Sequence, residues 1–74
     1  MANIGDRVKL KMNIRCVDVQ YYEGEEGTIT FIAPEVGKPL FPITVAIDGH
    51  DYTFKSKPVF AKDELLVKRN RAQE

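Results

Sequence analysis

The sequence predicts an all-β protein, a small closed barrel of about five short strands with one tight helical turn before the last strand. Three observations lead to this class. No segment keeps the helical period for ten residues, short runs of alternating apolar and polar residues recur, and turns rich in glycine or proline separate these runs. The 74 residues form one domain. Closure of the sheet would remove most exposed strand edges.

The first strand is predicted over residues 7–14, with one apolar and one basic face. Its apolar residues are Val8, Leu10, Met12 and Ile14. The phase then reverses, and the apolar residues of the next stretch are Val17, Val19 and Tyr21. A bulge or bend is therefore expected between Ile14 and Val17.

Gly24 and Gly27 are expected to bracket the next turn, and a strand follows at residues 28–32 with Ile29 and Phe31 facing the core. Residues 33–42 contain three prolines and a glycine, which excludes regular structure and makes this the longest loop. The next strand, 43–47, places three apolar residues on one face: Ile43, Val45 and Ile47.

Asp48-Gly49 is a strong hairpin signal. With these two residues as the loop, Val45 would pair with Tyr52 and Ile43 with Phe54. Every apolar residue of the returning strand would then share the core face, so the register is self-consistent.

After this hairpin, residues 60–65 are predicted to form a single helical turn, and a last short strand contains Leu65 and Val67. Residues 69–74 are polar and without period, which indicates a C-terminal tail. Residues 1–68 thus have the element order of an SH3-like barrel, with five strands and one helical turn before the last of them.

The composition indicates a reducing compartment, and we expect a cytoplasmic protein. Cys16 is the only cysteine, so no disulfide can form within the chain. It is expected to serve as a small core hydrophobe rather than as a reactive thiol. No apolar run is long enough to span a membrane, and the N-terminal residues lack the apolar core of a signal peptide.

The charges balance overall but are unevenly placed along the chain. Eleven basic residues match eleven acidic ones, which argues weakly against a dedicated nucleic-acid binder. Residues 16–37 carry five acidic residues and no Lys or Arg, whereas residues 1–15 and 52–71 are predominantly basic. If the fold kept these blocks apart, the molecule would be electrically two-sided and could steer a charged partner.

Four segments carry a resemblance to known proteins. They are GDRVKLK (residues 5–11), EGEEGTI (23–29), PITVAI (42–47) and FAKDELLV (60–67). Together they resemble the SH3-like electron-transport accessory proteins, a group that includes photosystem I subunit IV and the variable chain of ferredoxin–thioredoxin reductase. The first two motifs also occur in KOW-type barrels associated with translation. These motifs mark the fold better than the function, because their glycines and apolar residues have structural roles.

The resemblance and the residues together favour a non-catalytic, protein-binding accessory module that docks on a larger enzyme or redox complex. In the accessory proteins, basic surface residues help to dock acidic ferredoxin, and this role would carry over to Arg7, Lys9 and Lys11. A second docking surface is predicted where Tyr22 points outward from an acidic loop, since aromatic residues anchor interfaces. Its acidic members are Glu23, Glu25 and Glu26. Tyr22 could equally pack over the neighbouring loop.

Two alternatives stay open. The first is a KOW-like or Tudor-like module that binds nucleic acid or the ribosome through a basic strip: Lys55, Lys57, Lys62, Lys68, Arg69 and Arg71. Its nearest rings, Tyr52 and Phe60, are expected in the core, where bases cannot stack on them. The second is a structural or host-interaction protein of a phage or mobile element.

Chemistry is not expected from this chain. His50 is the only histidine and is predicted to lie in a solvated turn near two aspartates. A metal site would normally bring more His or Cys ligands, and no nucleophile lies close in sequence. We therefore expect no catalytic residues, no metal and no cofactor.

Overall fold

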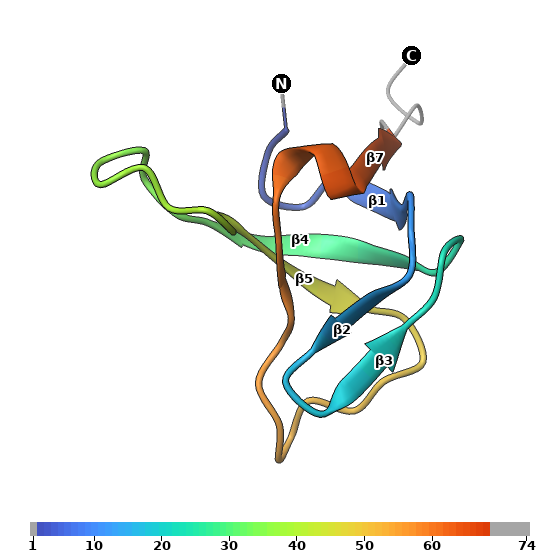
Figure 1. Cartoon of the computed structure of the whole chain (residues 1–74). Coiled ribbons are helices and arrows are strands. Elements are labelled where there is room, and N and C mark those ends of the chain that lie inside the picture. The colour runs from blue at the N-terminus through green and yellow to red at the C-terminus, as the bar shows by residue number, and fades with distance from the viewer. Residues whose placement is uncertain (1, 69–74) are drawn as a thin grey trace.

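The computed structural model describes residues 2–68, which form an almost entirely β structure (Figure 1). In chain order the elements are β1 (Arg7–Leu10), β2 (Ile14–Cys16), β3 (Val19–Tyr21), β4 (Glu26–Ile32), β5 (Ile43–Ile47), β6 (Val59–Phe60), the 3-10 turn η1 (Lys62–Glu64) and β7 (Leu65–Lys68). The predicted all-β class is confirmed, as are the curled five-stranded sheet and the helical turn before the last strand. The predicted tail, residues 69–74, lies outside the described residues.

The five-stranded sheet is antiparallel, with the strand order β6-β5-β4-β1-β7, and β2 and β3 form a separate hairpin. β4 is the shared strand, because it pairs with β1 at its beginning and with β5 along its length. Gly27 of β4 pairs with both neighbouring strands, because it lies opposite Val8 of β1 and Ile47 of β5. β4 therefore joins the two halves of the curled sheet.

The core lies inside the curl and, among residues 2–68, is entirely apolar apart from the Tyr21 phenol. Its buried members are Val8, Leu10, Tyr21, Ile29, Ile43, Val45, Ile47, Phe60 and Leu65. The rings of Tyr21 and Phe60 meet edge to face, with centroids 6.3 Å apart. The prediction that Tyr21 enters the core is confirmed, and Phe60 is fully buried as expected.

The first predicted strand is too long. β1 ends at Leu10, the chain bends at residues 11–13, and Met12 is exposed. The reversal of the apolar phase marks a hairpin turn at residues 17–18, not a bulge in one strand. Val17, expected on the apolar face, occupies the tip of this turn with a positive φ of 56° and is 84% exposed. A β-branched residue rarely adopts this conformation.

Phe31 was also predicted to face the core, and this is wrong. The pairing of β4 with β5 shifts register between Ile29 and Phe31. The irregularity turns the Phe31 side chain outward, and Ile32 packs against the core instead. Alternation alone does not reveal such a shift, because it inverts the face of every residue beyond it.

The predicted pairing of residues 50–54 with β5 is wrong, although the Asp48-Gly49 turn is present. β5 pairs with β6, so that Ile43 lies opposite Phe60. The Tyr52 hydroxyl accepts a hydrogen bond from the Ile47 amide (3.2 Å), which a strand partner would otherwise satisfy. Phe54 is consequently not a core residue and is 96% exposed.

Gly27 lies inside β4 and not in the preceding turn, and its lack of a side chain is required there. A Cβ atom at this position would lie 2.5 Å from the Ala46 carbonyl oxygen and 2.8 Å from a Val45 methyl carbon. Gly24, in contrast, does lie in the turn, with a φ of 94°.

We predict that Gly27→Ala lowers the free energy of unfolding by about 1–3 kcal/mol, because the added methyl group overpacks a site bounded by backbone. Thr30→Ala, on the exposed side of the same strand, is the control and should stay within about 0.5 kcal/mol of the wild type. Urea unfolding measures both. Equal stability of Gly27→Ala and wild type would contradict the close approach of β4 and β5.

Candidate protein-docking surfaces

Residues 33–42, named the arm here, project from the ends of β4 and β5 away from the rest of the molecule (Figure 1). The Ala33 amide donates to the Pro42 carbonyl (2.8 Å), so the two sides of the arm start as a continuation of the β4–β5 ladder. Its tip is a turn in which the Lys38 amide donates to the Glu35 carbonyl (2.9 Å). The prolines prevent further ladder bonds, as the sequence predicted.

The arm and its base carry an unusual share of exposed apolar side chains. Val36 is 90% exposed and Leu40 79%, and Phe31 and Phe41 are each about half exposed. Several apolar side chains exposed on one projecting segment and its base are typical of an interaction surface. The sequence analysis missed this surface, although apolar residues between prolines in a non-alternating segment were a usable signal.

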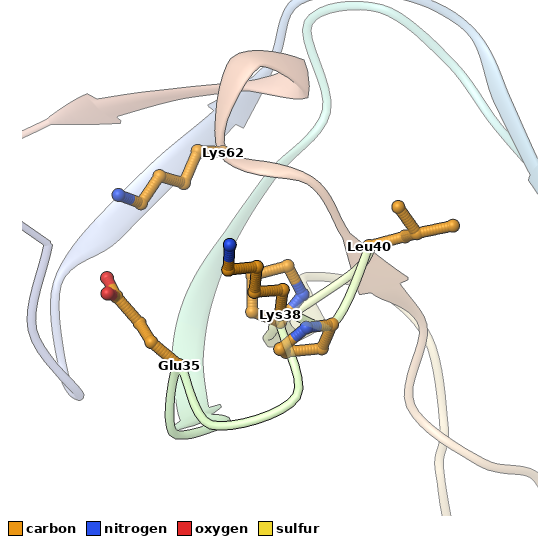
Figure 2. A pocket seen from close by; sticks show the side chains of 6 residues that line it. Glu35, Lys38, Leu40 and Lys62 are labelled. Carbon is orange, nitrogen blue, oxygen red and sulfur yellow. The ribbon is translucent and has the colours of Figure 1, made fainter.

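A hollow of about 450 Å³ lies between the arm and η1. Its lining residues are Glu35, Lys38, Pro39, Leu40, Pro42 and Lys62. Figure 2 shows the charged ends of Glu35, Lys38 and Lys62 on the same side of the hollow, whereas Leu40 points away from them. Two elements that are distant in sequence, the arm and η1, therefore supply charges to one place.

The predicted Tyr22 surface is present only in part. Tyr22 points outward, with 57% of its surface exposed, and Glu23 is exposed beside it. Glu25 has a structural role, because its carboxylate accepts a hydrogen bond from the Tyr22 amide (2.9 Å) and contacts His50 Nε2 (3.1 Å). The outward orientation of Tyr22 was predicted from the strand phase of Tyr21 and is confirmed.

Arg7 is held within the molecule. Its guanidinium donates to both carboxylate oxygens of Asp48 and to the Thr28 hydroxyl (2.8 Å). It also lies 3.7 Å from Glu26, which in turn contacts Lys68 at 3.0 Å. Arg7 of β1 is thus paired with acidic residues of β4 and of the turn after β5. At these contacts the basic and acidic blocks are not kept apart, so the molecule is not electrically two-sided there.

These ion pairs shift the pKa values of the carboxyl groups. The Arg7 guanidinium lowers the pKa of Asp48, mainly through its hydrogen bond. The hydrogen bond from Lys68 lowers the pKa of Glu26, with smaller contributions from Lys9 and Arg7. All four groups are partly exposed, so water and salt screen the attraction.

Lys9 and Lys11 come together with part of the predicted Tyr22 surface. They line a second hollow, of about 500 Å³, together with Glu23, Gly24 and the exposed Leu66 of β7. The two predicted protein-binding sets therefore share one face, but with Arg7, Glu25 and Glu26 engaged in contacts within the chain.

His50 does not lie in a solvated turn. Its ring is 4.9 Å from the ring of Tyr21 and stacks near Tyr52 at 6.2 Å, while Nε2 contacts Glu25. The Tyr21 and Tyr52 hydroxyls are 3.4 Å apart. Burial, and then this hydrogen bond, raise the pKa of Tyr21 far above its ordinary value of 10. The cluster joins the loop after β3 to the segment after β5.

The proposed nucleic-acid strip is not continuous. Lys55 and Lys57 lie near the ring of Tyr52, with Nζ atoms 5.6 and 6.0 Å from its centroid. Lys62 belongs to η1, which lies at the opposite end of Figure 1 from the segment around residues 53–57, and Lys68 is paired with Glu26. Arg69 and Arg71 lie outside the described residues.

Cys16 is half-buried and packs against the core, where it lines a third hollow of about 260 Å³. Residues 2–68 contain no group of three or more His, Cys, Asp and Glu side chains placed to hold a metal ion. Within the same residues, no helix has the length and apolar character needed to cross a membrane.

Comparisons of the chain with protein-family models, with curated proteins and with solved structures gave no match. The resemblance to electron-transport accessory proteins therefore stays a prediction from the sequence.

We predict that Arg7→Gln lowers the free energy of unfolding at neutral pH and that this loss shrinks in acid. The pKa values of Asp48 and Glu26 are lowered on folding, below ordinary values of 3.8 and 4.5. A carboxyl group of this kind stabilises the fold when the pH is above its ordinary pKa. That contribution is lost as the pH falls through the lowered pKa of the folded state.

Urea unfolding from neutral pH to about pH 2 measures this dependence. Lys11→Gln, an exposed lysine on the same segment, is the matched control and should show a smaller, more uniform change. A pH-independent loss in Arg7→Gln would contradict a role for its ion pairs.

Proposed function

We propose that this chain is a non-catalytic protein-binding module that docks on a larger protein or complex through its arm. The observation that carries the proposal is the exposed apolar surface of Phe31, Val36, Leu40 and Phe41 on a projecting segment. Binding of a partner that covers such apolar side chains is favourable, because it removes their surface from water. The resemblance to accessory proteins suggests an enzyme or redox complex as the partner.

The barrel serves as a rigid support in this proposal. The arm starts from β4 and β5, the two strands with the most extensive pairing in the sheet, and the Ala33–Pro42 hydrogen bond joins its two sides at the base. An anchored loop loses less conformational freedom on binding than a free one, which favours affinity. Tyr22 and the hollow beside Lys9 and Lys11 supply a second, more polar contact area.

Nucleic-acid binding is the second candidate, and one observation favours it. Phe54 is 96% exposed and is followed by Lys55 and Lys57, which are near a second ring, Tyr52. Exposed rings between cations are the arrangement on which single-stranded bases stack. This candidate predicts binding that weakens steeply as the salt concentration rises.

Site-specific photo-crosslinking in cells of the source organism distinguishes the two candidates. A photoreactive phenylalanine analogue replaces Phe41 on the arm or, as the matched position, Phe54. We expect the probe at position 41 to give an adduct with one defined protein, identified by mass spectrometry. Adding Val36→Asp should abolish that adduct without unfolding the chain, because Val36 is almost fully exposed.

The opposite outcome is equally clear. Absence of a protein adduct at position 41, or an adduct only with another copy of this chain, would reject docking on a larger protein through the arm. A nucleic-acid adduct at position 54, sensitive to salt, would establish the second candidate.

A further inference from the structure

Two lysines that form no ion pair with any residue from 2 to 68 line the hollow between the arm and η1. Within residues 2–68 the ion pairs of the structure involve Arg7, His50 and Lys68 as cations. Lys38 and Lys62 make none there, although both line the hollow together with Glu35. Figure 2 shows the two ammonium groups and the Glu35 carboxylate reaching out from the surrounding backbone on the same side.

Lys38 has an unfavourable backbone conformation. Its φ is 49°, in the left-handed region that L-residues other than Asn and Asp rarely adopt. Gly37 before it also has a positive φ, and the Lys38 amide is tied to the Glu35 carbonyl. Asparagine or glycine would fit position 38 with less strain. A lysine at this position is therefore unfavourable for the turn and supplies a cation to the hollow.

The remaining lining of the hollow is apolar. Pro39, Pro42 and Leu40 contribute rigid or branched hydrocarbon surface, and the exposed Val36 lies on the same arm. A ligand that fits must therefore combine negative charge with apolar groups. Glu35 limits the negative charge that the hollow accepts, because a second anion near this carboxylate would be repelled.

We propose that this hollow binds an acidic segment of the partner protein, with a carboxylate between Lys38 and Lys62 and a neighbouring apolar side chain on Pro39, Pro42 and Leu40. The proposal rests on the protein-binding function above and specifies the chemistry of the partner. Charge complementarity favours this occupant over a nucleic acid, whose continuous phosphate charge would meet Glu35.

The test uses the complete chain, labelled with ¹⁵N, and three synthetic peptides of alternating sequence. They are Glu-Leu, Gln-Leu and Lys-Leu repeats of equal length, and oligothymidylate is a fourth ligand. We expect the Glu-Leu peptide to shift the amide signals of Lys38 and Lys62 at low salt, and less so at physiological salt. The Gln-Leu and Lys-Leu peptides should bind more weakly at these positions.

Four variants test the assignment. Lys62→Gln should weaken binding of the Glu-Leu peptide by about twofold to fivefold, the range for exposed ion pairs. Lys38→Asn should weaken it similarly while raising the urea midpoint, because asparagine relieves the left-handed strain. Glu35→Gln should strengthen binding. Lys55→Gln, at a lysine that lines a different hollow, should change nothing.

Several results would overturn the inference. Equal binding of the Gln-Leu and Glu-Leu peptides would reject the acidic chemistry while leaving apolar docking on the arm intact. Stronger shifts of the same signals by oligothymidylate would identify a phosphate ligand, and shifts that depend on protein concentration alone would identify a second copy of this chain. Absence of binding by every ligand would reject the site, and the photo-crosslink at Phe41 would then decide separately whether the arm docks on a protein.

Discussion

At Gly27, β4 pairs with both of its neighbours, with Val8 of β1 on one side and Ile47 of β5 on the other. This shared position joins the two halves of the sheet. This position needs a residue without a side chain, because the β5 backbone occupies the space where a Cβ atom would lie. The curl that follows encloses the apolar core and places the ends of β4 and β5 away from β1 and β7. The arm leaves the sheet at the opposite end of the same β4–β5 pairing, next to the Ile32–Ile43 pair.

Local sequence pattern predicted those parts of the fold that depend on neighbouring residues. The alternation around Val8 and Leu10 and along residues 43–47 identified two core strands, and the phase of Tyr21 separated a buried ring from an exposed one. The failures involve choices between distant partners. β5 pairs with β6, which places the Phe60 ring opposite Ile43 in the core. The hairpin pattern of residues 48–54 does not reveal that a more distant segment competes for the same strand edge.

The charge pattern along the sequence misled for a related reason. Charges were assigned to separate blocks along the chain, but antiparallel pairing of β1 with β4 sets basic and acidic residues side by side, as in the contact of Arg7 with Glu26. Arg7 and Glu26, two of the predicted protein-binding residues, are therefore engaged in ion pairs within the chain. The arm was dismissed as an irregular loop, although exposed apolar residues and a lysine in a strained backbone conformation distinguish it from an ordinary solvent-exposed loop.

The arm begins at the hydrogen bond between Ala33 and Pro42, and none of the buried core residues belongs to it. Loop-closure entropy rises only slowly with loop length, by about 0.6 kcal/mol for each doubling. Insertions or deletions at the tip therefore cost the barrel little stability. The length and chemistry of this segment can therefore change while the scaffold stays the same. Under the proposed docking function, barrels of this kind with arms of different length would be expected to bind different partners.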